Sequence, residues 1–106
     1  MMLDFIRDTV ITAVNTRVKV YSKPSDKVVY LRSLIIVNKA TALATVEVYS
    51  GSDTDVGNYR LLTVTVGANE TRILDRNVLE GFKAIHSIYV LTDQQPIRVS
   101  GTVELR

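Results

Sequence analysis

The stretch Val28-Val29-Tyr30-Leu31-Arg32-Ser33-Leu34-Ile35-Ile36-Val37-Asn38 is the longest apolar run of the chain. It is rich in β-branched residues, and turn-forming residues precede it (Pro24-Ser25-Asp26) and follow it (Lys39-Ala40-Thr41). The run is long for a strand but far too short to span a bilayer as a helix. We therefore predict a central strand that is covered on both faces and sets the register of its neighbours.

Outside this run, apolar and polar residues alternate with the period of two that is typical of β-strands. The predicted strands cover residues 9–14, 17–21, 28–38, 43–50, 59–66, 71–74, 87–92 and 97–105. Residues 75–81 depart from this period and suit a single helical turn, and Gly101 is predicted to mark a bulge or a close approach between strands. About eight strands without an amphipathic helix indicate an all-β fold, namely a single antiparallel two-sheet β-sandwich of jelly-roll or immunoglobulin-like kind.

The alternation begins at Thr9, so we assign the β-sandwich domain to residues 9–106 and predict an N-terminal arm or a short helical turn for residues 1–8. Phe5 and Ile6 form an apolar pair in this segment. Such a pair packs either on its own core or on a neighbouring subunit, and the sequence leaves both alternatives open. The segment carries acids and no unbroken apolar stretch, so we expect neither a secretory signal here nor a membrane partner.

The chain offers few side chains for catalysis. It has no cysteine, which excludes disulfides, thiol nucleophiles and thiolate metal sites. His86 is the only histidine, so neither a catalytic triad nor a zinc site can be composed around it. The acidic loop 53–58 resembles half of a calcium loop, but the bidentate glutamate is missing and turn chemistry is the better interpretation. We therefore expect a protein that is not an enzyme and that holds no cofactor or metal.

The positive charges are concentrated in one part of the chain, although the net charge is only +2. Alternating residues of one predicted strand and its end are expected to point outward together. They are Arg17, Lys19, Tyr21 and Lys23. Such a row suits either a nucleic-acid backbone with one stacking platform or an edge strand that charge protects from aggregation. The single aromatic side chain and the absence of a known nucleic-acid motif favour the protected edge.

Tyr49 and Tyr59 flank the acidic loop. Tyrosines at the end of a sandwich bind sugars or protein partners, and the absence of tryptophan favours a subunit contact over a carbohydrate platform. The candidate interface residues are therefore Phe5, Ile6, Arg17, Lys19, Tyr21, Lys23, Tyr49 and Tyr59.

Four segments, taken in order, resemble a known family. They are Val29-Tyr30-Leu31-Arg32-Ser33-Leu34-Ile35-Ile36-Val37-Asn38, Ala44-Thr45-Val46-Glu47-Val48-Tyr49, Val66-Gly67-Ala68-Asn69-Glu70-Thr71 with Leu79-Glu80-Gly81, and Val99-Ser100-Gly101-Thr102-Val103-Glu104. Together they resemble the small β-sandwich structural proteins of tailed bacteriophage virions, and the resemblance covers residues 18–106. The chain departs from that pattern at Val66-Gly67, where a proline is common, and at Phe82, where an acid is common.

The resemblance implies a non-enzymatic structural protein of a phage particle, made in the host cytoplasm and located in the virion. The implied role is capsid decoration or stabilisation, or an accessory role at the head–tail junction or tail. The implied partners are capsid or tail subunits and further copies of the chain in a homo-oligomer, a trimer or a larger ring. The residues leave open an alternative, a binding module for nucleic acid through residues 17–23 or for a glycan through Tyr49 and Tyr59.

Overall fold

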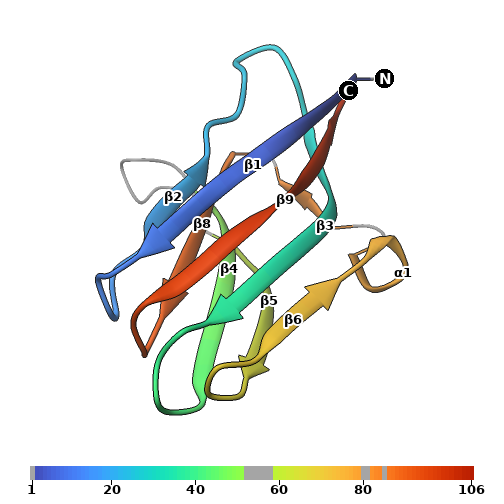
Figure 1. Ribbon diagram of the computed structural model, residues 1–106. Coiled ribbons are helices and arrows are strands. Elements are labelled where there is room, and N and C mark those ends of the chain that lie inside the picture. Colours follow the sequence, from blue (N-terminus) through green and yellow to red (C-terminus); the bar gives the residue numbers. More distant parts are fainter. Residues whose placement is uncertain (1, 52–58, 80–81, 85) are drawn as a thin grey trace.

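The computed structural model describes residues 2–51, 59–79, 82–84 and 86–106 (Figure 1). These residues form nine strands and one helical turn. The elements are β1 (Met2–Ile11), β2 (Val18–Tyr21), β3 (Val29–Asn38), β4 (Ala44–Gly51), β5 (Tyr59–Val66), β6 (Thr71–Leu74), α1 (Arg76–Leu79), β7 (Lys83–Ala84), β8 (Ser87–Thr92) and β9 (Ile97–Leu105).

The strands form two antiparallel sheets, which confirms the predicted all-β sandwich. One sheet has the order β1-β9-β3-β6, with the short β7 also beside β3, and the other has the order β2-β8-β4-β5. The ladders join β1 to β9, β2 to β8, β3 to β6 and β4 to β5. This is a long antiparallel ribbon rolled into two layers, so of the two predicted kinds of sandwich the chain adopts the jelly roll.

The core lies between the sheets and is built by alternate residues of each strand. In β3 the inward side chains include Leu34 and Ile36, and in β4 they include Val46 and Val48, all of them fully buried. Burying one such aliphatic side chain contributes roughly 1.5–3 kcal/mol, so the strict alternation fixes which face of each strand points inward.

The prediction that β3 is covered on both faces is wrong. Its burial alternates, and Ile35 is 37% exposed on the outer side of the sheet. The strand is apolar on both faces because the sheet has a second apolar side, which no other part of the described chain covers.

A bulge shapes the centre of the same sheet. The register between β3 and β9 shifts between Leu31 and Ser33. A Cβ atom added to Gly101 would clash with the backbone carbonyl of Ser33, which confirms the predicted close approach at this glycine.

The prediction of an arm or a helical turn for residues 1–8 also needs correction. Residues from Met2 onward belong to β1, and Met2 pairs with Leu105 while Ile6 pairs with Gly101. The alternation is hard to see in the sequence because the register shifts between Ile6 and Thr9, where charged residues interrupt the pattern. As a result the two ends of the chain lie side by side at one corner of the sandwich (Figure 1).

Two polar residues fix the connections on the opposite side of the fold. Asn38, fully buried at the end of β3, donates from its amide nitrogen to the carbonyl oxygens of Ala42 and Val66, both at 2.9 Å. Its side-chain oxygen accepts from the Ala40 backbone N–H at 2.9 Å. These bonds hold the turn after β3 against the end of β5. Asn69 occupies the left-handed region (φ 58°) in the predicted turn before β6.

Candidate interaction surfaces

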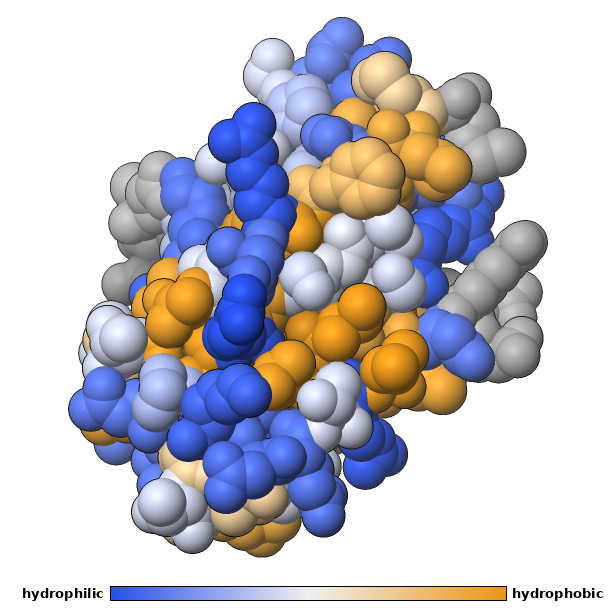
Figure 2. Space-filling view, viewed as in Figure 1, coloured by the Kyte–Doolittle hydropathy of each residue, from blue (hydrophilic) through white to orange (hydrophobic). Residues whose placement is uncertain are grey.

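The outer side of the sheet β1-β9-β3-β6 carries a group of exposed apolar side chains, which we call the apolar face. Its members are Leu3 (64% exposed), Phe5 (68%) and Val10 (55%) on β1, Ile35 (37%) on β3 and Ile73 (67%) on β6. Figure 2 shows this side of the molecule, with several apolar patches that are separated by a pale strip and by a strongly hydrophilic strip that crosses the face. Residues from distant parts of the chain therefore combine into one surface.

Short polar side chains occupy the middle of the apolar face. Thr102 of β9 lies between Phe5 and Ser33 in the ladder, and the Ser33 and Thr102 hydroxyls are hydrogen-bonded at 2.8 Å. One step along, Ser100 lies opposite Ile35, which in turn lies opposite Ile73. The apolar side chains of β1 and of β3 thus stand about 10 Å apart on either side of a shallow central strip.

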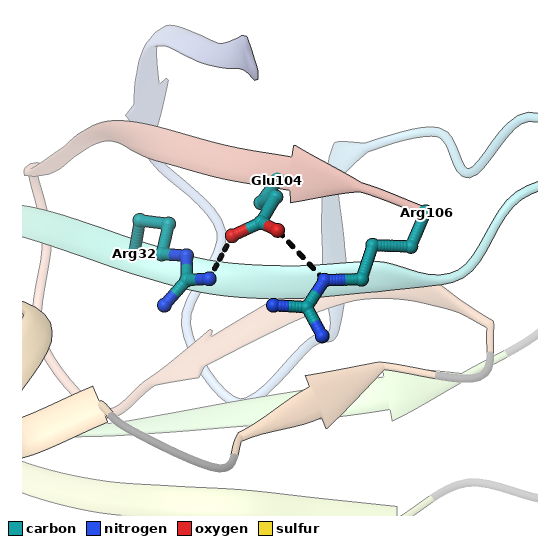
Figure 3. Close-up of polar contacts among 3 residues, drawn as sticks. All are labelled: Arg32, Glu104 and Arg106. Carbon is teal, nitrogen blue, oxygen red and sulfur yellow. Dashed lines mark hydrogen bonds and ion pairs between the residues drawn. The ribbon is translucent and has the colours of Figure 1, made fainter. Parts of the chain in front are cut away.

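One end of this face holds a buried carboxylate (Figure 3). Glu104 lies on the outer side of β9, yet its side chain is only 2% exposed because the Arg32 and Arg106 guanidiniums cover it. Arg32 forms an ion pair with one carboxylate oxygen, and Arg106 Nε donates to Glu104 Oε1 at 2.7 Å. The Arg106 guanidinium also lies over the Tyr30 ring, 4.4 Å from its centroid. This cluster joins the last strand to β3.

A second charged pair lies on the same side of the sheet, where Asp8 falls between Phe5 and Val10 along β1. Asp8, in the irregular part of β1, forms an ion pair with Arg98 of β9, and both side chains are about half exposed. The hydrogen bond from Arg98 holds the pKa of Asp8 below its usual value. Charged groups therefore interrupt the apolar face, since Leu3 lies opposite Glu104 and Val10 lies opposite Arg98.

The outer side of the sheet β2-β8-β4-β5 has a different chemistry, and we call it the tyrosine face. The ladders place Lys19, Tyr89, Tyr49 and Arg60 in one row across its four strands. The Arg17 guanidinium lies 5.5 Å from the centre of the Tyr89 ring. The Tyr49 hydroxyl donates to Glu47 Oε2 at 2.5 Å, and this bond raises the pKa of Tyr49.

The predicted basic row does not form a single track. Arg17 and Lys19 belong to the tyrosine face, but a register shift after Lys19 turns Tyr21 inward, where it is 8% exposed. The Lys23 ammonium donates to the carbonyl oxygens of Pro24 (2.9 Å) and Lys27 (2.7 Å), so it holds its own turn together. The alternation in the sequence concealed the bulge that separates these side chains.

At the corner where the sheets meet, β1 and β2 line a hollow of about 490 Å³. The Tyr21 hydroxyl donates to Asp4 Oδ2 at 2.8 Å across this corner. That bond is the main reason why the pKa of Asp4 is lowered, and burial together with the same bond raises the pKa of Tyr21 to about 12. Hydrogen bonding therefore uses both polar groups internally.

The remaining candidate interface residues differ in how exposed their side chains are. Phe5 is exposed on the apolar face, whereas Ile6 is 2% exposed and belongs to the core, so it is not available to a partner of the folded chain. Tyr49 lies half-buried on the tyrosine face. The Tyr59 side chain and the acidic loop 53–58 lie outside the described residues.

Sequence reasoning missed most of the apolar face. Leu3, Val10, Ile35 and Ile73 were not among the candidates, although a signal was present. In a strand with one buried side, neighbouring apolar residues such as Ile73 and Leu74 cannot both face the core. One member of each such pair must therefore lie on the outer surface.

Within the described part of the chain, no three His, Asp or Glu side chains come together as a possible metal site. His86 lies half-buried, and its backbone N–H donates to the Ser50 hydroxyl at 3.1 Å. No helix among the described residues is long and apolar enough to cross a membrane.

Comparison with known proteins supports the fold alone. No protein-family model matches the chain, and no curated protein matches it. Among solved structures, the crystal structure of PirA superposes with a TM-score of 0.56, covering 94% of this chain and 92% of that chain at 19% identity. The chain is therefore similar to PirA in its fold over most of its length.

Proposed function

We propose that this protein is a non-enzymatic structural subunit of a phage particle, and that it binds other virion subunits through the apolar face. The proposal rests on one observation: the outer side of β3 and its neighbouring strands exposes large apolar side chains. Phe5 and Ile73 are each about two-thirds exposed. The role in a virion rests on the resemblance of residues 18–106 to virion β-sandwich proteins. The apolar face supplies the surface that such a role needs.

The energetics favour adhesion through this face over chemistry at a site. Exposed apolar area costs roughly 25 cal/mol per Å² relative to burial, and contiguous apolar patches on soluble domains commonly mark interaction sites. Two charged pairs, Arg32–Glu104 and Asp8–Arg98, lie among these apolar side chains, so a partner would meet apolar anchors with charged neighbours. Capsid decoration, or an accessory position at the head–tail junction or tail, would use such a surface.

The experiment is to purify particles of the phage whose genome encodes this chain on a density gradient and to quantify the chain in them by mass spectrometry. We expect a fixed number of copies per particle. In particles assembled with Phe5→Asp we expect the chain to be lost, whereas Thr63→Asp, an exposed position on the tyrosine face, should keep it. Detection in the lysate but never in particles would refute the virion role.

A ligand-binding module is the second candidate, and one observation favours it. Tyr49 and Tyr89 are neighbours in the row across the tyrosine face, with Arg17 against Tyr89. Stacked rings beside cations are used to bind sugars and single-stranded nucleic acid. Binding of the purified protein to a dT20 oligonucleotide that weakens steeply with salt, or binding to an immobilised glycan array, would favour this candidate.

A further inference from the structure

The free edge of β5 differs from the other edges of the two sheets. We infer that it pairs in antiparallel fashion with β5 of a second copy, so that two copies of the sheet β2-β8-β4-β5 join into one continuous sheet. Main-chain hydrogen bonding at an edge selects a β-strand as the partner, and the residue pattern of β5 selects its own copy. The contact belongs to the sheet that does not carry the apolar face, so it goes beyond the proposed function and does not rest on it.

The strands that end the two sheets are β1, β6, β2 and β5, and three of them are protected against strand addition. β1 carries Asp4, Arg7 and Asp8 and has a register shift. β2 and β6 have four residues each, with Lys19 in the first and Arg72 in the second. Short length, charged side chains and bulges are the means by which natural sheets prevent their edges from pairing with another chain.

The last six residues of β5 lack this protection, because none of them is charged and none is proline or glycine. They are Leu61, Leu62, Thr63, Val64, Thr65 and Val66. Within the described residues, β5 has a ladder on one side only, with β4, and this ladder is regular over residues 62–66. Every second residue of such an edge strand directs its N–H and C=O away from the sheet, so the edge offers main-chain donors and acceptors to a further strand.

The alternation along this edge is complementary to itself. The inward side chains are Leu62, Val64 and Val66, because they lie opposite buried residues of β4. Thr63 and Thr65 point outward. A two-fold axis perpendicular to the sheet at Val64 places Leu62 opposite the second copy's Val66, and Thr63 opposite its Thr65. Apolar side chains then meet apolar side chains and threonine meets threonine, which are favourable cross-strand pairs.

The register centred on Val64 also keeps charge out of the contact. It pairs residues 62–66 only with one another and leaves Arg60, beyond the register shift, outside. Leu62 and Val64 are only partly buried, so an added strand covers apolar area that one copy leaves in water. Five paired residues make a small interface, so we expect a weak dimer with a Kd of roughly 0.1–1 mM.

The first test is light scattering of the full chain from about 20 µM to about 2 mM, a range in which a contact of this strength changes from monomer to mainly dimer. Two double variants with charges at the same exposed positions test the register. Thr63→Lys/Thr65→Lys places like charges opposite each other and should weaken the dimer by about 10-fold or more. Thr63→Lys/Thr65→Glu places opposite charges there and should preserve it. Thermal melting of both variants checks that they fold.

A cross-link tests which residues meet. The chain has no cysteine, so only introduced cysteines can react. In the inferred register residue 63 lies opposite residue 65 of the second copy, whereas equivalent residues are diagonal neighbours roughly 7–8 Å apart, beyond disulfide reach. An equimolar mixture of Thr63→Cys and Thr65→Cys chains should therefore form covalent dimers in a glutathione redox buffer. Either variant alone should form few.

A chain that is monomeric at about 2 mM would overturn the inference, and so would a trimer or a ring. A dimer to which the two double variants respond alike would overturn it as well. The contact and the virion role fail separately. Because incorporation is assigned to the apolar face, a chain that lacks the β5 contact should still enter particles. A monomer found in particles refutes only the dimer, and a dimer absent from particles refutes only the virion role.

Discussion

The two outer faces of the sandwich show how one core can support opposite surfaces. On the tyrosine face the exposed groups satisfy each other, since Glu47 accepts from Tyr49 and lies 3.5 Å from Arg60. On the apolar face the described residues leave most of the Phe5 and Ile73 side chains uncovered, and water surrounds most of their area. The difference indicates that a partner is more favourably bound on the apolar face, where burial removes apolar area from water.

The two faces also differ in how far they bury a glutamate side chain. Both faces carry a glutamate next to arginine, but Glu104 is 2% exposed and Glu47 is 23% exposed at the side chain. A covered ion pair leaves a buried charge when one member is removed, whereas an exposed pair leaves a charge that water can solvate.

The largest effect on stability is expected from Glu104→Gln. The substitution leaves the largely covered Arg32 guanidinium without its carboxylate, so we expect the free energy of unfolding to fall by about 3 kcal/mol. Glu47→Gln on the tyrosine face is the matched control and should cost less than about 1 kcal/mol. Urea unfolding of both variants measures the difference, and equal losses would mean that the two faces treat charge alike.

A smaller loss is expected from Gly101→Ala in the centre of the sheet that carries the apolar face. The new methyl group clashes with the backbone carbonyl of Ser33, so the strands must separate, at a cost of about 2 kcal/mol. Ser100→Ala, the preceding residue on the outer side, should change stability little. Thermal melting followed by circular dichroism compares them, and an unchanged melting temperature for Gly101→Ala would contradict the close approach.

The corner where the two sheets meet predicts a dependence on pH. The folded state raises the pKa of Tyr21 to about 12, so the stability linked to this group is complete below pH 10 and is lost as the pH rises from 10 towards 12. The lowered pKa of Asp4 works in the opposite direction, because its contribution is present above pH 4 and is lost as the pH falls through the folded value. Melting temperatures across pH test both.

Tyr21→Phe is the control for that experiment. It removes both the ionisable phenol and the hydrogen bond to Asp4, so its melting temperature should vary less with pH at both extremes than that of the natural chain. Parallel curves for the two proteins would show that this corner does not set the pH response.

The smallest effect is expected on the tyrosine face, from Tyr49→Phe. The variant loses a half-exposed hydrogen bond to Glu47, which contributes about 0.5 kcal/mol in such positions. The variant should be incorporated into particles as the natural chain is. A loss of this variant from particles, with Phe5→Asp retained, would move the contact from one face of the sandwich to the other.

Much of the fold could be predicted because its strands have one buried side. The long run was placed as a strand, and its observed bounds, Val29–Asn38, differ by one residue. The choice between jelly roll and immunoglobulin-like sandwich could not be made, because it depends on which strands pair, and β1 pairs with β9 from the other end of the sequence. Local alternation contains no information about such distant pairing.

Two of the wrong assignments among the candidate interface residues have the same physical cause, a register shift within a strand. After Lys19 a register shift turns Tyr21 into the core, and another shift after Ile6 hides the alternation of β1. The surface of a strand is predicted by counting in twos, so one extra residue reverses every assignment beyond it. Exposed positions such as Ile73 were missed for a different reason, since the apolar residues of the predicted strands were assigned to the core.

The position of β9 has a consequence for how the chain is made. It is synthesised after all the other described strands, yet it lies between β1 and β3 in the sheet. At about 5–20 residues per second, the first strand waits several seconds on the ribosome before Ile97–Leu105 emerge. Until then β1 and β3 lack their common neighbour, so this sheet cannot be completed before the last described strand has been made.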